Sequence, residues 1–436
     1  MASANENPHD EITKEALNEV EEAKNIILFK PDGTAYGDRH TARAQPNQRL
    51  VEAFGIDNAF TSIDTDWRRM FIKDTTTKMK AATKIQEKND ESKGDWRDLR
   101  SSAIDALKEF LSQPGDKKSL TDMAQFVTLK VSLGFLFDDA AKAMKHPDSF
   151  KDIQYIGAKI NTIWIESKNE SGKRPQWSDE KKLHKALLSV TTLPPVTMPG
   201  WWAKNDASNI DPLDPKKNPM NFLLPAYETM WRVVMRCVLE VLYRNNPSDR
   251  VQWKSVLSKY FDALKDADAM DKGIFWERSQ IGITMIDIVK EALRLYPPSR
   301  HIHRIYNDKP YSADIERLHR NALLGSNDPL TFRPDRWLQI GSDLRKQVFN
   351  NVPGARKKLK TEEQRLGFMP FAFHCAADNR ETRAFGMKMI ALLVATLCDG
   401  LDGKWTLDKA DELPPDGEAL CTNREAYGGL LLKKTS

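Results

Sequence analysis

A chain of 436 residues with 40% hydrophobic and 29% charged residues has the composition of a globular protein, and its 11 Trp and 18 Phe supply a sizeable core. The formal net charge of +4 is small, and Lys and Arg alternate with Asp and Glu, which argues against nucleic-acid binding. The four cysteines lie far apart, which excludes a disulfide scaffold and a paired-cysteine metal site and indicates a reducing compartment.

The first 45 residues are expected to form an accessory segment. Residues 1–24 contain no apolar core of the kind a signal peptide needs, and their acidic residues do not suit a transit peptide, so we expect a cytoplasmic protein. The spacing of apolar and charged residues over 10–24 predicts an amphipathic helix. Residues 25–37, NIILFKPDGTAYG, predict a short strand that leads into a Pro-Asp-Gly turn.

Helical spacing dominates the next part of the chain. Apolar residues recur at intervals of three and four between residues 48 and 137, and a further helix is expected at residues 152–167. Residues 191–219 are rich in Pro, Asp and Asn and predict a loop. The most apolar stretches, residues 125–137 and 387–398, are shorter than the roughly 20 residues that span a bilayer, so we expect no transmembrane helix.

A central helix is predicted at residues 221–244, NFLLPAYETMWRVVMRCVLEVLYR. Its apolar residues cover nearly every face, which is typical of a helix that runs through the middle of a core. Pro225 removes one backbone hydrogen bond and predicts a bend beside Glu228 and Thr229.

Helices are expected to continue to Arg294, where Tyr296-Pro297-Pro298 ends the run and extended segments begin. A last apolar helix is predicted at residues 382–399, followed by a C-terminal hairpin. Glu291 and Arg294 lie nearly one helical turn apart and can form an ion pair, which in isolation is typical of a solvated surface.

Two motifs that follow this pair change its interpretation. LYPPSRHIHR comes directly after it, and Phe332-x-Pro-x-Arg-Trp337 follows about thirty residues later. In this order the motifs resemble the cytochrome P-450 superfamily, whose signature is a Glu-x-x-Arg helix followed by a Pro-x-Arg-aromatic meander. The resemblance covers about residues 45–436. It implies a mainly α fold with small β-sheets, in which a triangular helical domain and a smaller β-rich region form one catalytic domain at residues 46–436.

The resemblance also implies roles for individual residues. Arg304, with His301 as a neighbour, matches the contact to the haem propionates, and a guanidinium suits carboxylates because it can pair with them in a bidentate fashion. Trp67-Arg68-Arg69 is similar to the helix that contacts the propionates, and a surface or core role of these residues is the alternative. A buried structural triad is implied for three residues, namely Glu291, Arg294 and Arg336.

Pro225-Ala226-Tyr227-Glu228-Thr229 is similar, with departures, to the central-helix motif of the superfamily, in which a small pair and one variable position precede an acid and an alcohol. The resemblance implies that Glu228 and Thr229 relay protons, a task that needs titratable groups within hydrogen-bond reach. The alternative is that the two side chains only satisfy backbone groups at the Pro225 bend. The sequence leaves both interpretations open.

The cysteine loop, GFMPFAFHCAADNRETRAFG, departs from the superfamily pattern. Counting back from Cys375 places Phe368 at the expected aromatic position. However, Phe371 stands where the superfamily has a glycine, and Phe373 stands where it usually has a basic residue. The missing glycine matters because a tight turn beneath a porphyrin needs small residues.

Two registers of this loop therefore stay open. In the first, the resemblance implies that Cys375 is the thiolate ligand of the iron in haem b. In the second, alignment with the start of the last helix places the ligand position on Asp378. His374 is a further candidate ligand, although a histidine beside apolar residues is more often a hydrogen-bonded structural group.

The implied activity is that of a haem-thiolate monooxygenase or oxidase. INTIWIESK and REAYGGLLLK resemble segments of fungal secondary-metabolism members, which implies a hydrophobic natural-product substrate of terpenoid or polyketide type. The basic run at residues 356–360 matches the face that meets an acidic electron donor, so a flavoprotein reductase is the implied partner. The alternative is an enzyme of the same fold that has lost oxygen activation or haem and catalyses a cyclisation, isomerisation or dehydration with Glu228 or Asp378 as acid or base.

Overall fold

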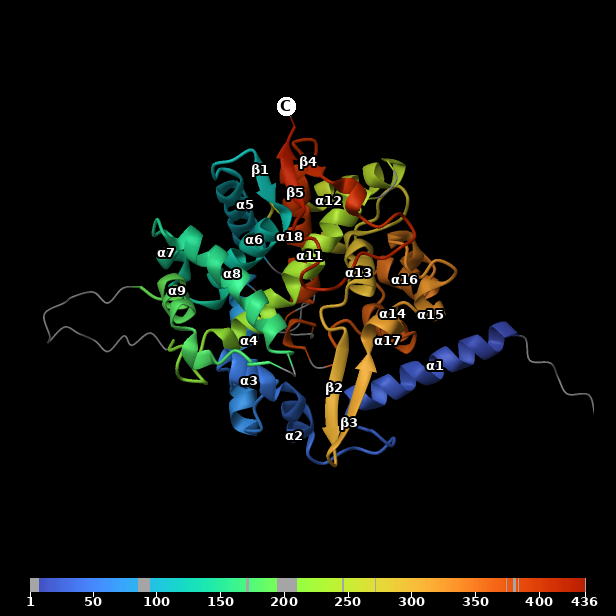
Figure 1. Cartoon of the computed structure of the whole chain (residues 1–436). Coiled ribbons are helices and arrows are strands. Elements are labelled where there is room, and N and C mark those ends of the chain that lie inside the picture. The colour runs from blue at the N-terminus through green and yellow to red at the C-terminus, as the bar shows by residue number, and fades with distance from the viewer. Residues whose placement is uncertain are drawn as a thin grey trace, which may run out of the picture.

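The computed structural model is mainly helical and carries two small antiparallel sheets in the part of the chain that it describes (Figure 1). This is the fold class expected from the sequence. The described residues are 8–84, 95–169, 172–193, 210–244, 247–270, 272–373, 375–378, 382 and 384–435.

The N-terminal segment begins with α1 (Pro8–Ile27), which is longer than the predicted helix. The strand predicted at residues 25–37 is wrong, because α1 continues through Ile27 and Phe29 then takes the left-handed conformation (φ 62°), which turns the chain. The apolar face of α1 buries Val20 and Ala23 against β3 (Lys309–Asp314) and the helices that follow it, and Figure 1 shows α1 beside that strand. Two short helices come next, α2 (Arg39–Ala44) and α3 (Gln48–Phe54).

A group of packed helices forms the next part of the chain. The side chain of Asp64 caps α4 by accepting hydrogen bonds from two backbone N–H groups of the first turn, and Ser119 caps α6 by accepting one, from the N–H of Asp122. Helix α6 is buried along most of its length and packs against both α5 and α8. The helices are α4 (Thr65–Ala82), α5 (Arg97–Leu111), α6 (Leu120–Leu136), α7 (Ala140–Ala143), α8 (Ser149–Glu166) and α9 (Lys181–Thr191).

The central helix forms as predicted, but two stretches of it are wider π-helical turns. It consists of α10 (Met220–Leu223), a π turn (Leu224–Glu228), α11 (Met230–Leu239) and a second π turn (Glu240–Arg244). The first π turn contains Pro225, which has no N–H to donate. Because π turns often mark functional positions in helices, this turn is the natural place to look for a site.

The C-terminal half supplies the remaining elements around the central helix. Both α13 and α18 pack against α11, and the hairpin formed by β2 and β3 follows the double proline. The helices are α12 (Pro247–Ala263), α13 (Met285–Leu295), α14 (Ile315–His319), α15 (Ala322–Gly325), α16 (Ser342–Phe349), α17 (Ala355–Arg365) and α18 (Phe385–Leu401). The other strands are β1 (Lys117–Ser119), β2 (His301–Tyr306), β4 (Trp405–Asp408) and β5 (Leu431–Lys434), with the sheet order β1-β5-β4.

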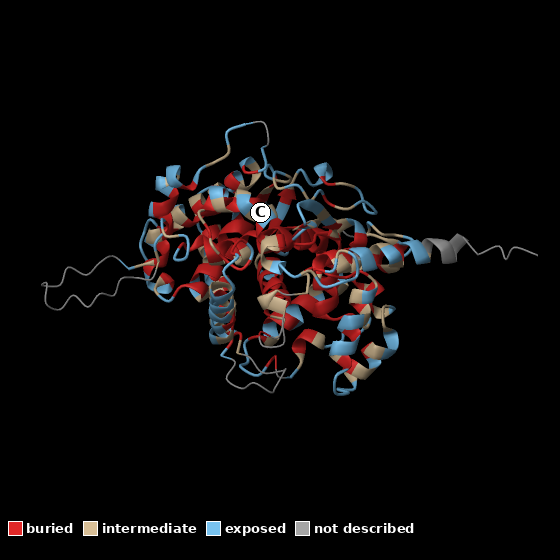
Figure 2. Cartoon of the chain, turned by 90° about the horizontal axis from the view of Figure 1, so that it is seen from below, coloured by how far each residue is buried: buried red, intermediate tan, exposed pale blue. Residues whose placement is uncertain are grey.

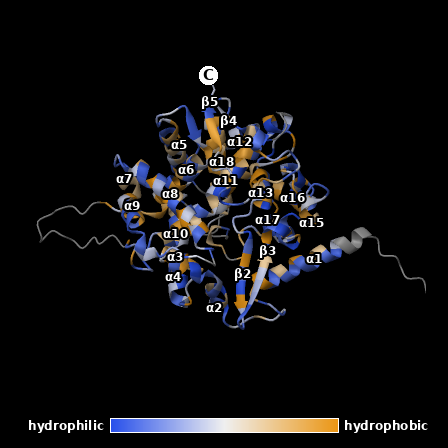
Figure 3. Ribbon diagram, viewed as in Figure 1, coloured by the Kyte–Doolittle hydropathy of each residue, from blue (hydrophilic) through white to orange (hydrophobic). Residues whose placement is uncertain are grey.

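The core lies where these interior helices meet. Figure 2 shows the buried residues concentrated in the interior, with exposed residues on the peripheral helices, and Figure 3 shows hydrophobic residues along α18 and β5. Removing this apolar surface from water is the main driving force for such a fold. Among the described helices, none combines the length and the apolar character needed to cross a membrane.

Candidate functional site

The structure brings Glu291, Arg294 and Arg336 together in the core. Arg294 donates to both carboxylate oxygens of Glu291, from Nε over 3.0 Å and from Nη2 over 2.8 Å. Arg336 donates to the same carboxylate over 2.8 Å, and Trp337 Nε1 donates to it over 3.0 Å. We call these four residues the Glu291 clamp.

Backbone carbonyl oxygens take up the remaining donors of the clamp. Arg294 Nη1 donates to Pro329 over 2.7 Å, and Arg336 Nη1 donates to Gly325 over 2.7 Å. Glu291 and Arg294 are fully buried, so each such partner offsets a large loss of hydration. The clamp therefore fastens the meander to α13, which is a structural task.

Glu228 lies at the end of the first π turn and is fully buried. It forms an ion pair with Arg424 of the C-terminal segment and a looser one with Arg232, whose Nε lies 3.6 Å from Glu228 Oε1. Neither carboxylate oxygen accepts a hydrogen bond of ordinary geometry from the described residues. Because Oε1 is already in direct contact with Arg424 Nη1, it is Oε2 that has no partner among the described residues, which is unusual for a buried carboxylate.

Thr229 is placed differently from its neighbour. Its Oγ1 donates to the carbonyl oxygen of Pro225 over 2.8 Å, which is the backbone role that the second interpretation of the motif described. Glu228 instead contacts arginines and no backbone group of the bend. The two residues are adjacent, but they differ in role. Thr229 stabilises the helix, whereas the surroundings of Glu228 are not those of a residue that stabilises a helix.

Arg304 belongs to a group of three arginines near Phe29. The guanidinium of Arg304 lies 4.7 Å from the ring centroid of Phe29, and that of Arg43 lies 5.0 Å from it. Arg68 of α4 contacts His40 of α2, which is the helix that carries Arg43. We call Arg43, Arg68 and Arg304 the Phe29 arginines.

The electrostatics of the Phe29 arginines indicate an anion site. Burial, together with the like charges of Arg68 and Arg304, lowers the pKa of Arg43 to about 9. Burial lowers the pKa of Arg304 to about 10, and its buried Nε has no hydrogen-bond partner among the described residues. A buried guanidinium with an unused donor is stabilised by a carboxylate or phosphate.

The two histidines of β2 lie on the other face of the strand. His301 and His303 are exposed and stack at 6.0 Å, while Arg304 between them and Tyr306 is buried. His301 Nε2 lies 3.5 Å from Asp314 on the paired strand. Because side chains alternate along a strand, His301 points to the face of β2 opposite Arg304. It is therefore not part of the group formed by the Phe29 arginines.

Cys375 lies in the loop before α18, directly before a short turn (Ala376–Asp378) that packs against both α4 and α18. The thiol is half-buried, and burial raises its pKa to about 11, so the free thiol is protonated at neutral pH. Helix α4 also carries Arg68, and it therefore connects the cysteine turn to the Phe29 arginines.

Bulky residues replace the glycines of this loop, and the structure shows how they are accommodated. Ala372 takes the left-handed conformation (φ 53°) in place of a glycine. The ring of Phe371 packs against the start of α18 at Gly386, where an added Cβ would lie 3.5 Å from Phe371 Cζ. Phe373 packs with Met369 against the apolar face of α1. The N-terminal helix thus holds the segment that leads into Cys375.

Asp378 and His374, the other two candidate iron ligands, are less well supported than Cys375. Asp378 pairs with Lys360, whose Nζ lies 2.7 Å from Oδ2 and also donates to the Asp378 carbonyl oxygen over 3.0 Å. A carboxylate engaged in this way is a structural link between the turn and α17. His374 lies outside the described residues.

Haem needs an anion-binding group for its propionates and one axial protein ligand. The orphaned Nε of Arg304, in a group of like charges, meets the first requirement, and the thiol of Cys375 in a turn against α4 meets the second. The residues present fit the group, although the loop reaches this arrangement with Phe371 where the sequence pattern has a glycine.

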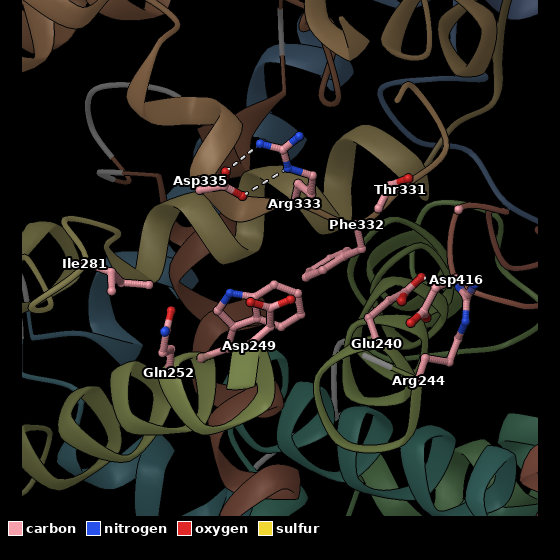
Figure 4. Close-up of a pocket in the computed structure, with 12 residues that line it drawn as sticks. Glu240, Arg244, Asp249, Gln252, Ile281, Thr331, Phe332, Arg333, Asp335 and Asp416 are labelled. Carbon is pink, nitrogen blue, oxygen red and sulfur yellow. Dashed lines mark hydrogen bonds and ion pairs between the residues drawn. The ribbon is translucent and has the colours of Figure 1, made fainter. Parts of the chain in front are cut away.

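A surface cavity of about 450 Å³ lies apart from these groups (Figure 4). It begins at the second π turn, where Glu240 pairs with Arg244 over 2.7 Å, and Figure 4 shows the Arg333–Asp335 pair on its opposite side. Glu240 is twelve residues from Glu228, which is about 18 Å along a helix. This cavity is not part of the candidate site.

The sequence did not reveal two of the groups that the structure places here. Arg424 reaches Glu228 from the C-terminal segment, and Arg43 and Phe29 reach Arg304 from the N-terminal one. The only signal for Arg424 was its position inside REAYGGLLLK, a segment that resembles the superfamily. Contacts between residues so far apart carry no periodic signature in a single sequence.

Comparison with known proteins gives the fold. No model of a protein family matches the chain, and no curated protein is similar to it. The crystal structure of a variant of cytochrome P450 OleT in complex with arachidonic acid matches with a TM-score of 0.51 at 13% identity, over 95% of this chain and 87% of that one. A cytochrome P450 from Streptomyces coelicolor A3(2) matches with a TM-score of 0.46 at 15% identity, over 91% and 86%.

The class is therefore that of large, mainly helical proteins built around a central helix, which in this chain is interrupted by two π turns. More particularly, the chain has the cytochrome P450 fold. At these identities the likeness concerns the fold, and function has to be argued from the site.

Proposed function

We propose that this chain is a haem-thiolate oxidising enzyme, a monooxygenase or oxidase, that acts on a hydrophobic natural-product intermediate of terpenoid or polyketide type. The observation that carries the proposal is the group of Phe29 arginines. In a chain with the P450 fold, three buried or half-buried cations with an orphaned donor call for an anion, and the propionates of haem b provide two.

Each candidate residue has a role in this proposal. Arg304 binds a propionate with help from Arg43 and Arg68, and Cys375 provides the thiolate for the iron. When bound, haem supplies the oxidation chemistry, while the protein supplies orientation and a site that excludes water. Because burial raises the pKa of Cys375, the thiol has to give up its proton as it becomes a metal ligand.

Proton handling falls to Glu228. It is the buried carboxylate of the central helix, and its ion pair with Arg424 connects it to a segment with exposed residues. A buried carboxylate suits general acid-base work, and Arg424, which keeps its own proton, holds this carboxylate in place instead of relaying protons to it. Thr229 keeps its hydroxyl on the Pro225 carbonyl oxygen and acts with Glu228 only if that hydrogen bond is exchanged.

An absorption spectrum of the purified protein tests the proposal. Protein from haem-sufficient cells should be red, and its reduced carbon monoxide adduct should absorb at the long-wavelength position typical of a thiolate ligand. Cys375→Ser should abolish that position, whereas Cys421→Ser, which changes an exposed cysteine, should preserve it. Arg304→Gln should lower the haem content. Colourless protein that does not take up added haem would contradict the proposal.

A second candidate function is favoured by the loop itself. Phe371 in place of a glycine suits a protein that uses the same fold without haem, as a cyclase, isomerase or dehydratase. Glu228 or Asp378 would then act as acid or base. Colourless protein that converts substrate without a reductant would support this alternative.

The implied partner of the leading function is a flavoprotein reductase. Helix α17 presents Lys357 and Lys358 to solvent, and Lys360 on the same helix pairs with Asp378 of the cysteine turn. Opposite charges speed such encounters at low ionic strength. Charge reversal at Lys357 and Lys358 should slow the first electron transfer, and added salt should erase the difference from wild type.

A further inference from the structure

A second group of basic side chains surrounds Trp164 of α8, next to Glu228. The guanidinium of Arg424 lies 4.3 Å from the ring centroid of Trp164, and that of Arg49 lies 5.2 Å from it. Arg49 Nη1 also donates to Ser167 Oγ over 2.6 Å. Residues from α3, α8 and the C-terminal segment therefore meet at one indole.

The charges of this group are not balanced. Among the described residues, Glu228 is the one carboxylate within ion-pair distance of Arg424 and Arg232, and the side chains of these two arginines are only 8% and 10% exposed. Arg49 and Lys168 form no ion pair with an acid in the described ranges of the chain. Positive charge is thus in excess around Trp164.

The cations also affect one another. Partial burial and the like charges of Arg424 and Arg49 lower the pKa of Lys168, and burial lowers the pKa of Arg424 to about 9, with Arg49 as the next cause. Nη1 of Arg424 is buried in its ion pair with Glu228 Oε1. Stacking on Trp164 stabilises a guanidinium only modestly, which does not offset the crowding of several like charges.

An anion from outside the chain would relieve this crowding. A carboxylate or phosphate can accept hydrogen bonds from the planar edge of a guanidinium while its charge is shared with a lysine. Arg49 is half-buried and Lys168 reaches solvent, so the group is open at one end and closed by Glu228 at the other.

We propose that Arg49, Lys168 and Arg424 around Trp164 bind the anionic head group, a carboxylate or phosphate, of an otherwise apolar substrate. This inference deepens the proposed function and rests on it, because the group lies beside the carboxylate assigned to proton handling. It narrows the substrate class from any hydrophobic molecule to an amphiphilic acid.

Isothermal titration calorimetry with three probes of equal chain length tests the inference. Dodecanoate and dodecyl phosphate, below their micelle concentrations, should bind at least tenfold more tightly than dodecanol, since one charge-assisted contact corresponds to about a factor of ten. Preference between the two acids identifies the head group. Equal affinity for dodecanoate, dodecyl phosphate and dodecanol would overturn the inference.

Variants separate the site from general charge attraction. Arg49→Gln and Lys168→Gln should each weaken dodecanoate binding about tenfold and leave dodecanol binding unchanged. Lys182→Gln is the matched control, because Lys182 stacks on Tyr155 of the same helix at 4.3 Å but lies outside the group. An equal loss in all three variants, or no loss in Arg49→Gln and Lys168→Gln, would contradict the inference.

The binding measurement does not depend on haem. Colourless protein that binds dodecanoate through Arg49 and Lys168 would leave the anion site standing while the proposed oxidation fails. Red protein with the thiolate signature and no preference for the acid would keep the proposed function and remove the anion site.

Discussion

Two buried glutamates on neighbouring helices have opposite surroundings. Glu291 on α13 receives hydrogen bonds from Arg294, Arg336 and Trp337. The remaining donors of the two arginines go to backbone carbonyl oxygens and, from Arg336, also to the Asp328 carboxylate. Glu228 on the central helix is equally buried but is held by ion pairs with Arg424 and, over 3.6 Å, with Arg232, and its Oε2 has no hydrogen-bond partner among the described residues.

The difference separates a structural role from a functional one. A fully satisfied buried charge network holds a single arrangement and is costly to disturb. A buried carboxylate that the fold leaves under-satisfied can change partner or protonation at lower cost, which is what proton transfer and ligand binding require. The Glu291 clamp therefore has a structural role. The Glu228 region, by which we mean Glu228 with Arg232 and Arg424, is the part of this scaffold that we expect to act in function.

The largest expected effect comes from breaking the clamp. Glu291→Gln removes the charge that two buried arginines share, and we expect it to lower the free energy of unfolding by about 3–5 kcal/mol. Chemical denaturation followed by circular dichroism measures this change.

The matched control has the same geometry on the surface. Glu362 and Arg365 form the same two-point pair three residues apart on α17, with exposed fractions of 31% and 54%. Glu362→Gln should cost no more than about 0.5 kcal/mol. Similar losses in both variants would mean that burial does not set the strength of the clamp.

The clamp could be predicted from the sequence, whereas most of the Glu228 region could not. Glu291, Arg294 and Arg336 belong to short motifs with fixed spacing, so local pattern and resemblance place them. Arg424 and Arg49 reach Trp164 from distant parts of the chain, and no spacing rule connects them. The helices followed their periodicity, but the strand predicted at residues 25–37 failed because tertiary packing of α1 overrode local β propensity.

A second prediction concerns the loss of stability at low pH. It involves His319, which links the Glu291 clamp to the cysteine loop. The backbone carbonyl oxygen of His319 accepts from Arg294, and its ring accepts from the backbone N–H of Met369 over 2.9 Å. Burial lowers the pKa of His319 to about 3, so its contribution to stability is complete above the unfolded pKa of about 6.5 and is lost as the pH falls toward 3.

Between pH 6.5 and pH 5 this histidine should cost about 2 kcal/mol of unfolding free energy. In His319→Gln that part of the pH dependence should disappear, while His146→Gln, at an exposed position, should keep it. Denaturation curves at several pH values measure the difference. A pH profile that His319→Gln leaves unchanged would show that the ring is not buried in neutral form.

The third prediction applies to Glu228 the same substitution that breaks the clamp. Glu228→Gln should lower the free energy of unfolding by about 1–3 kcal/mol, less than Glu291→Gln, because it leaves two largely buried arginines without this charge while Arg232 keeps its hydrogen bond to the Pro298 carbonyl oxygen. Turnover should fall by about 100-fold if Glu228 handles protons. Unfolding as severe as that of Glu291→Gln, or full turnover, would remove the distinction between the two glutamates.

The smallest expected effect is that of a substitution at Ala372, in the cysteine loop. Ala372 holds a left-handed conformation that glycine adopts without strain, so Ala372→Gly relieves about 1 kcal/mol of strain and loses a similar amount of chain entropy and packing against α1. The net change should stay within about 0.5 kcal/mol. Haem retention is the more sensitive measurement. A glycine next to Phe371 would let the loop turn more tightly, as it does in the superfamily pattern, and so place Cys375 where that pattern has its cysteine. If Ala372→Gly retains more haem than wild type, the bulky residues of this loop limit cofactor binding, and if retention is unchanged, the packing of Phe371 and Phe373 has already compensated for the missing glycine.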